Sequence, residues 1–393
     1  MTLPDKGIET QEQILLKNRD MLCFGHDWNG DPLSKTHLMK IFARNNRVLW
    51  INSIGYRTPK VSRKDLARVY RKLKTMMTPL TKAESNIYVL SPLVIPVHNK
   101  PVIQRINRVL LKFQIKAAMW WLGFKKPLNW VFYPTASIVS GELGEDKLIY
   151  YCADEFTAMS EVASASLVEL EQRLMKRADM VFVSANNLYS SKEKWNPNTF
   201  LIRHGVDYSH FKKALDPKTR VPIDIANLPH PIIGYFGLMA TDWFDLELML
   251  NVAKSFPEGS IVLLGNSTMD ISRLTEMPNV HYLGRKPYDS LPAYSKGFDV
   301  GLIPFPINNV TLNANPLKAR EYLAAGVPVV STRIPEVEHL GLCRIATDQE
   351  DMAGEIKAAL ADSTTREARS LAMQTESWES RVEEISRHFL NLQ

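Results

Sequence analysis

A lysine and a glutamate lie three residues apart at the start of a helix that the sequence predicts over residues 316–325. Pro316 suits the first helical turn, where its missing N–H costs no hydrogen bond, and Gly326 suits the position after the last turn. The free N–H groups and the positive dipole end of such a helix favour a phosphate group. Lys318 adds a positive charge there, and Glu321 can accept hydrogen bonds from sugar hydroxyls. The pattern suits a bound nucleotide-sugar; the alternative is an ordinary helix whose two charged side chains face solvent.

Two carboxylates directly follow a strand that we expect over residues 147–152. Asp154 and Glu155 then lie at the carboxyl end of that strand, where ligands bind in doubly wound sheets. A carboxylate in this place can act as a general base. Asp154 is the preferred catalytic residue and Glu155 an alternative. In the structural alternative, Asp154 only caps a helix that begins near Phe156.

A second group of polar residues follows the first strand, which we expect over residues 19–24. Gly25, His26 and Asp27 begin a glycine-bounded loop that leads into a predicted helix, as in the first βα turn of a doubly wound domain. We expect His26 and Asp27 to face the same cleft, which makes them further catalytic alternatives. In the structural alternative, the polar residues of this loop only cap the helix.

Positive charge is concentrated in the first half of the chain. Residues 57–126 contain 16 lysines and arginines against two acidic residues, Asp65 and Glu84. Such asymmetry indicates an anionic partner, either nucleic acid or an anionic membrane surface. Clustered aromatic residues at Trp120 and Trp121 alone do not provide the interleaved stacking residues of a nucleic-acid site, so no nucleic acid is expected.

A basic amphipathic helix is predicted over residues 102–122. Its apolar residues recur at helical spacing and end in a tryptophan pair, as in helices that lie on a membrane surface. The alternative is a core-packed helix with a solvated basic face. The residues expected to contact the membrane or the acceptor are Arg105, Arg108, Lys112, Lys116, Trp120 and Trp121.

A length of 393 residues predicts two domains. We expect the first at residues 1–212, a proline-bearing linker at 213–230, the second at 231–375, and a terminal helix at 376–393. A helical stretch is also expected over 57–82, and long helices over 348–361 and 364–390. No apolar run approaches the length of a membrane span, and the N-terminus does not have the pattern of a signal peptide. The three cysteines follow no metal spacing and fit a reducing cytosol.

Residues 312–332 resemble the donor-site signature of GT-B glycosyltransferases of family 4, the glycosyltransferase group 1 type. The run Pro-Leu-Lys-x-x-Glu-Tyr at 316–322 resembles the run found at this place in the family members that build bacterial cell-surface polysaccharides. Glu321 stands at the second glutamate of the signature, and Asn313 replaces the first. A second match, His-Gly-Val-Asp-x-x-x-Phe at 204–211, resembles the element that closes the first domain of these proteins.

The resemblance implies an α/β fold of the GT-B type. Two Rossmann-like, doubly wound domains would face a cleft, and the C-terminal helix would cross back onto the first domain. The cleft side of the first domain would include Gly25, His26, Asp27, His204 and Gly205.

The resemblance also implies roles for the donor-site residues. Gly237 would approach the donor phosphates. No arginine or lysine follows it, so Lys318 would carry more of the charge, with help from Arg285. The N–H groups near Pro316 and Leu317 would neutralise the departing diphosphate, Glu321 would hold the ribose, and Asn313 and Asn315 would touch the sugar. No metal or other cofactor is expected.

The function implied is transfer of a sugar from a nucleotide diphosphate sugar to a hydroxyl of a lipid-linked or membrane-adjacent glycan. The protein would be cytoplasmic and peripheral on the inner face of the cell membrane, in cell-surface polysaccharide synthesis. Asp154 would be the base in an inverting reaction and a positioning group in a retaining one; both remain open. Two alternatives are a non-hydrolysing nucleotide-sugar epimerase of the same fold and a non-enzymatic, nucleic-acid-binding α/β protein.

Overall fold

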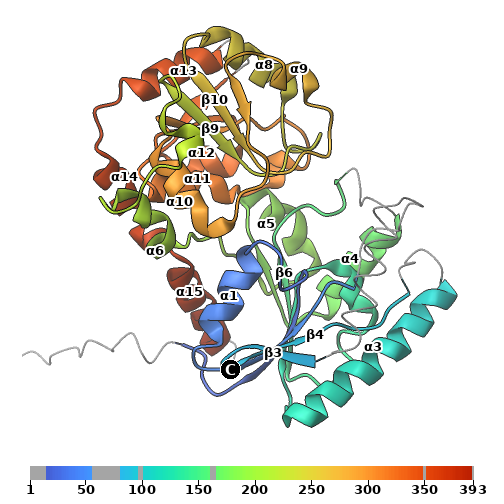
Figure 1. The fold of residues 1–393 in the computed structure, drawn as a ribbon. Helices are drawn as coiled ribbons and strands as arrows, with labels where there is room; N and C mark the ends of the chain where they lie inside the picture. The colour runs from blue at the N-terminus through green and yellow to red at the C-terminus, as the bar shows by residue number, and fades with distance from the viewer. Residues whose placement is uncertain (1–14, 55–79, 96–100, 160–164, 348–350, 392–393) are drawn as a thin grey trace, which may run out of the picture.

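The protein folds into two α/β domains, one above the other in Figure 1. The computed structural model describes residues 15–54, 80–95, 101–159, 165–347 and 351–391. Each domain is built around one sheet of its own, and the expectation of an α/β fold with two doubly wound domains is confirmed.

The sheet of the first domain has the order β3-β4-β2-β1-β5-β6-β7-β8. All neighbours are parallel except β3, which forms an antiparallel hairpin with β4. The strands are β1 (Asp20–Phe24), β2 (Arg47–Ile51), β3 (Leu80–Glu84), β4 (Ile87–Leu90), β5 (Leu128–Val131), β6 (Lys147–Cys152), β7 (Met180–Val183) and β8 (Thr199–Leu201).

Helices cover both faces of this sheet, because successive side chains of each strand point to opposite sides. Leu22 and Phe24 of β1 pack toward the face that carries α3, α4 and α5, whereas Met21 and Cys23 pack toward α1. The helices are α1 (Ser34–Phe42), α3 (Pro101–Leu122), α4 (Ala165–Arg177) and α5 (Asn186–Lys192), with 3-10 turns η2 (Pro134–Ile138) and η3 (Glu193–Trp195).

The second domain has an all-parallel sheet in the order β11-β10-β9-β12-β13-β14. The chain reverses its direction of winding between β9 and β12, and ligands of open α/β sheets bind outside such a switch point. The strands are β9 (Ile232–Phe236), β10 (Ser260–Leu264), β11 (Val280–Tyr282), β12 (Val300–Ile303), β13 (Val329–Thr332) and β14 (Arg344–Ala346).

Short and medium helices surround this sheet. They are α8 (Leu246–Ser255), α9 (Ser272–Thr275), α10 (Leu291–Lys296), α11 (Leu317–Ala324), α12 (Pro335–Leu340), α13 (Asp351–Leu360) and α14 (Arg366–Ala372), with η5 (Tyr288–Ser290), η6 (Thr311–Asn313) and η7 (Gln374–Glu376).

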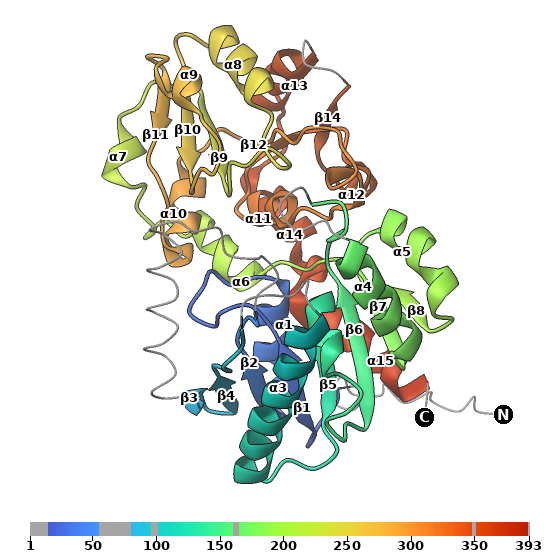
Figure 2. The same cartoon turned by 90° about the vertical axis from the view of Figure 1, so that its right-hand side faces the viewer.

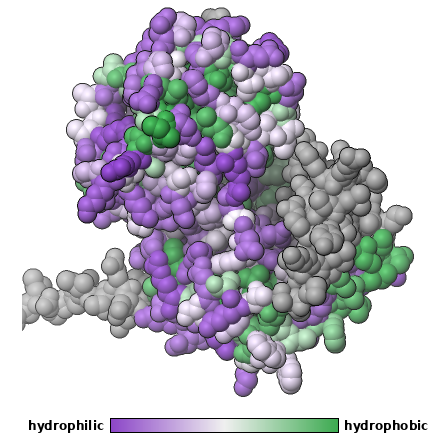
Figure 3. Space-filling model, viewed as in Figure 1, coloured by the Kyte–Doolittle hydropathy of each residue, from purple (hydrophilic) through white to green (hydrophobic). Residues whose placement is uncertain are grey.

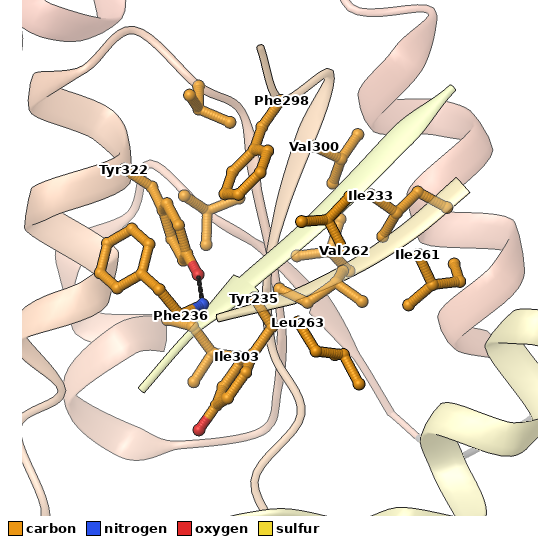
Figure 4. Packing of buried hydrophobic residues seen from close by; sticks show 14 of the residues in the cluster. Ile233, Tyr235, Phe236, Ile261, Val262, Leu263, Phe298, Val300, Ile303 and Tyr322 are labelled. Atoms are coloured by element: carbon orange, nitrogen blue, oxygen red, sulfur yellow. Dashed lines mark hydrogen bonds between the residues drawn. The ribbon is translucent and has the colours of Figure 1, made fainter. Parts of the chain in front are cut away.

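Helix α11 is fixed to the sheet by an aromatic side chain. The backbone N–H of Phe236 donates to the hydroxyl of Tyr322 over 2.9 Å, a bond drawn in Figure 4. The Tyr322 ring packs so closely on β12 that a Cβ at Gly301 would come within 2.7 Å of it. The N-terminus of α11 is therefore held beside the carboxyl end of β9.

The last helix, α15 (Trp378–Asn391), crosses back to the first domain, as expected, and lies beside α1 in Figure 1. Val382, Ile385 and Phe389 are buried in the first-domain core. One long helix was expected over residues 364–390; the structure has α14 and α15 instead. The helix is interrupted where the chain crosses between the domains. There the N–H of Val206 donates to the carbonyl oxygen of Glu376, and the N–H of Trp378 donates to the carbonyl oxygen of Val206.

Two other expectations differ from the structure. The helix predicted over 57–82 lies outside the described residues up to 79, and residues 80–82 belong to β3 because they pair with β4. The stretch 213–230 is not a free linker. It contains η4 (Lys212–Leu215) and α7 (Ile223–Ala226), whose Ala214 and Ile225 are buried in the second-domain core. A short helix, α6 (Tyr208–Phe211), precedes it.

Candidate active site

The turn after β9 brings Gly237 against the side chain of Lys318, the residue expected to bind the donor phosphates. Gly237 has a φ of 145°, and a Cβ there would lie 2.3 Å from Cε of Lys318. Gly265, at the end of β10, approaches even closer, since its Cβ would lie 1.8 Å from the carbonyl oxygen of Gly237. Only glycine permits this backbone path, which brings the Lys318 side chain across the turn.

Lys318 is a half-buried cation in the first turn of α11. Its ammonium group lies 5.6 Å from the ring centre of Tyr235 and 5.3 Å from that of Phe305. Within the described part of the chain, no carboxylate forms an ion pair with it and no side chain caps the helix N-terminus. Burial lowers the pKa of Lys318, and the charge of Glu321 opposes that shift. A cation beside free helix N–H groups is suited to an anionic ligand.

Glu321 lies one helical turn beyond Lys318 and is half-buried. Burial raises the pKa of Glu321 to about 7; Lys318 opposes the shift and Asp207 adds to it. Asp207 caps α6 by accepting a hydrogen bond from the N–H of His210 at 3.1 Å. Burial raises the pKa of the Tyr288 phenol, and the negative charge of nearby Glu321 raises it further. The hydroxyl of Tyr288 is buried and has no hydrogen-bond partner among the described residues.

Asp154 follows β6 on the opposite side of the cleft. Burial raises its pKa to about 6, against the attraction of Lys35, and Glu155 adds to the rise. A carboxylate with a pKa near neutrality is suited to exchange a proton with a substrate hydroxyl.

Lys35 is a buried cation that sequence reasoning did not identify. It lies in the first turn of α1, is only 5% exposed, and its ammonium group lies 4.6 Å from the ring centre of Tyr133. Its charge lowers the pKa values of Asp154 and His26, so it acts on both candidate groups at once. The only sequence signal was a lysine in the first turn of the helix that follows the 25–32 loop.

Glu155 points away from the cleft, unlike what its place in the sequence suggested. Its carboxylate forms an ion pair with Lys192 at 3.0 Å, and Lys192 also contacts Glu171 at 2.8 Å. All three side chains are at least nine-tenths buried below the sheet edge. Glu155 is therefore occupied in a structural ion network and does not fit the role of an alternative catalytic residue.

The loop after β1 places His26 and Asp27 differently from each other. Gly25 is covered by the Trp50 ring, which a Cβ would meet at 2.2 Å. His26 packs edge-on against the same ring, and burial lowers its pKa to about 4, so it is neutral at pH 7. Asp27 is exposed at the rim. Both follow the carboxyl end of β1, and His26 Nε2 lies 3.1 Å from the carbonyl oxygen of Asp31 in the same loop.

The two domains meet at His204 and Asn315. His204 Nδ1 lies 2.8 Å from the carbonyl oxygen of Asn315, and the Asn315 amide donates to the carbonyl of Ser184 over 2.7 Å. Arg320 donates to the Asn315 side-chain oxygen. Because Asn315 is 3% exposed and both the nitrogen and the oxygen of its side-chain amide are bonded, it forms a domain contact instead of the expected sugar contact. His204 is likewise buried at this contact and does not line open space.

The structure also gives contacts for four other expected site residues. Arg285 forms a bidentate pair with Asp31 of the first domain, at 2.6 and 3.1 Å, so it spans the cleft and does not point at the phosphate seat. Asn313 bonds to Asn309 within its own loop. Gly205 is required by packing, since its Cβ would lie 2.7 Å from the backbone nitrogen of Trp378. Leu317 packs against the first-domain core next to Pro316, which joins the start of α11 to that domain.

Comparison with known proteins agrees with this geometry. Residues 230–362 match the family described as glycosyl transferases group 1. TuaH of Bacillus subtilis (strain 168), described as a candidate teichuronic acid biosynthesis glycosyltransferase, is 24% identical over 227 residues, which are 54% of this chain and 56% of TuaH. The alignment thus spans about half the length of this relative.

Solved structures resemble the chain over nearly its whole length. Sucrose-phosphate synthase from Thermosynechococcus elongatus superposes with a TM-score of 0.67 at 16% identity, covering 96% of this chain and 99% of that one. Anabaena HepE in complex with UDP-glucose superposes with a TM-score of 0.63 at 14% identity, covering 95% of this chain and 100% of HepE. The chain has the GT-B fold. The resemblance indicated by the motifs at 204–211 and 312–332 is therefore confirmed.

Proposed function

We propose that this GT-B protein is a glycosyltransferase that uses a nucleotide diphosphate sugar. The observation that carries the proposal is the cation of Lys318, which lies at the N-terminus of α11 across the Gly237 turn and has no anionic partner among the described residues. UDP and UDP-glucose are the ligands of the Anabaena relative. A diphosphate leaving group gains negative charge as the sugar departs, and Lys318 with the helix N–H groups would stabilise that charge.

We propose that Asp154 faces the reacting sugar from the first domain. If the reaction inverts configuration, its carboxylate takes the proton of the acceptor hydroxyl; with a pKa of about 6, it is mostly ionised and ready to do so at pH 7. If configuration is retained, the same carboxylate positions the sugar. Glu321 would accept hydrogen bonds from the ribose. The buried hydroxyl of Tyr288, which has no partner among the described residues, lies nearby.

Calorimetry with UDP and GDP tests the donor site. Lys318→Ala should weaken binding of the preferred nucleotide by about 1.5–3 kcal/mol, the range for a lost charged hydrogen bond. Lys254→Ala, an exposed lysine at the end of α8, is the matched control and should bind as the wild type does. Unchanged affinity in a folded Lys318→Ala protein would reject the assignment.

The charge of Lys318 and of the helix end also makes a metal ion unnecessary in this proposal. Transfer, or slow hydrolysis of the donor, should continue at full rate after treatment with EDTA. The same assay addresses the epimerase alternative, because an epimerase would convert the donor sugar without an acceptor and without releasing the nucleotide.

We propose that the acceptor is a membrane-adjacent glycan, reached through helix α3. Six large apolar side chains on this helix are between 43% and 83% exposed: Val102, Ile106, Val109, Phe113, Trp120 and Trp121. We call them the α3 apolar surface; Figure 3 shows hydrophobic surface gathered over this helix. The opposite side of α3 packs Leu111 and Ile115 into the core. An exposed apolar patch with basic neighbours is typical of a membrane-surface helix.

The four basic residues of α3 are not equivalent. Arg108 and Lys112 share the carboxylate of Glu142, Lys112 at 3.3 Å, whereas Arg105 and Lys116 form no ion pair within the described chain. Arg105 and Lys116 should therefore contribute more to binding an anionic surface. No helix in the described ranges has the length and apolar character needed to cross the bilayer. The association proposed here is peripheral, on the inner face of the cell membrane.

Vesicle sedimentation tests the membrane proposal. Binding should require anionic lipid, weaken with salt, and fall when Phe113 and Trp120 are changed to Ser or when Arg105 and Lys116 are changed to Gln. Leu371→Ser, which removes an apolar side chain 62% exposed on α14, is the matched control. A protein that ignores anionic vesicles at low salt would indicate a soluble acceptor. The similarity to TuaH supports a glycan of a cell-surface polysaccharide.

A further inference from the structure

A cavity of about 220 Å³ lies where the two domains and the crossing helix meet. Its walls come from the end of β8, from α11 and α12, and from the stretch that runs from η7 into α15. None of its lining residues belongs to the candidate active site. The volume is several times that of a water molecule, which occupies about 30 Å³ in the liquid, so the space can hold a small molecule.

Three arginines line this cavity, and each keeps N–H donors without an acceptor among the described residues. Arg203 uses only its Nε, which donates to Glu336 over 2.7 Å. Arg320 donates to Glu376 through Nε and to Asn315 through Nη1, and its Nη2 has no acceptor among the described residues. Arg381 pairs with Glu376 and with Glu384 at 3.5 Å, while its buried Nε has no partner.

The acidic residues at the cavity do not satisfy these donors. Three carboxylates pair with the three guanidinium groups, Glu336 with Arg203 and Glu376 and Glu384 with the other two, so the charges balance while several N–H donors remain without an acceptor. Among these leftover donors, Nε of Arg381 is buried and has no partner in the described part of the chain. Buried N–H donors without acceptors are costly, and an oxygen-rich anion is the ligand that best satisfies guanidinium groups.

We propose that this cavity between the two domains and α15 is a second binding site, for a phosphate-sized oxyanion. The ligand would accept hydrogen bonds from Arg203 of the first domain, Arg320 of the second and Arg381 of the crossing helix. Because one ligand then contacts all three parts, its binding stabilises this relative arrangement of the domains. The site is separate from the donor phosphate seat at Lys318.

Calorimetric titration with inorganic phosphate, at ionic strength held constant with NaCl, tests the site. Lys318→Ala protein should still bind phosphate, since the donor seat is not involved. Arg203→Gln should weaken binding about tenfold or more, as expected for a lost charged hydrogen bond. Arg387→Gln, an exposed arginine elsewhere on α15, should bind phosphate as the parent protein does.

A variant with the opposite effect protects the test against simple misfolding. Glu384→Gln removes a negative charge at the cavity wall and should tighten phosphate binding several-fold, which an unfolded protein cannot do. Loss of all phosphate binding in Lys318→Ala would assign the ion to the donor seat and overturn the proposal. Equal binding by Arg203→Gln and Glu384→Gln, or no binding by the wild type, would also overturn it.

Discussion

Replacing Asp154 by Asn should abolish transfer and at the same time stabilise the fold. The carboxylate lies half-buried at the end of β6, and burial raises its pKa from 3.8 to about 6 although Lys35 attracts it. A folded-state pKa above the unfolded value means that the folded protein prefers the protonated form. The stability tied to this group is complete below pH 3.8 and is lost as the pH rises toward 6.

The shift of about two pKa units sets the size of the effect. Each unit corresponds to about 1.4 kcal/mol, so the ionised carboxylate costs the folded state up to about 3 kcal/mol at pH 7. Asn has nearly the same shape and no charge to desolvate. Asp154→Asn should therefore raise the free energy of unfolding at pH 7 and leave it nearly unchanged near pH 3.5.

Urea unfolding of wild type and variant at several pH values measures this difference, and calorimetry with UDP checks that the donor site survives. The exposed Asp27→Asn change in the neighbouring loop is the control and should not alter the unfolding free energy. A destabilised Asp154→Asn protein at pH 7, or a difference that does not depend on pH, would refute the reasoning. Transfer at nearly the wild-type rate would remove Asp154 from the mechanism.

Three further changes test the surroundings of the site. Gly237→Ala should weaken nucleotide binding in calorimetry, because the new Cβ would displace the Lys318 side chain at 2.3 Å and strain a φ of 145°. Glu155→Gln should lower the unfolding free energy in urea by about 1–3 kcal/mol, since Lys192 loses one of two buried carboxylates, and a stable variant would contradict the ion network. Arg285→Ala should widen the cleft, seen as a larger radius of gyration in X-ray scattering, because it removes a bidentate contact between the domains; the effect on stability should be below about 1 kcal/mol for this exposed pair.

The sequence was sufficient for features that depend on local spacing. Buried strands followed by short loops predicted both doubly wound sheets, and the helix start at Pro316 placed Lys318 and Glu321 on one side of α11. The position of Asp154 after β6 was predictable because a strand end determines which edge of the sheet the next residue occupies. The crossing of the last helix came from the resemblance to GT-B proteins, and the apolar face of α15 agrees with it.

The pattern of α3 was less informative, because the helix has apolar residues on two faces. Leu111 and Ile115 turn inward, whereas Val109 and Phe113 turn outward. Periodicity alone could not distinguish these faces. Only the position of the sheet beneath the helix decides which of them is buried.

Contacts between distant segments were decided by the tertiary structure alone. The charge of Lys35 acts on Asp154 from a helix more than a hundred residues earlier, and Asn315 bonds to Ser184 and Arg320 at the domain contact. Glu155 and Asp154 are adjacent in sequence yet face opposite ways, because the buried Lys192 stabilises a carboxylate on one side only. Spacing along the chain fixes which side chains share a local face, but the partner that each charge meets depends on where the whole chain has folded.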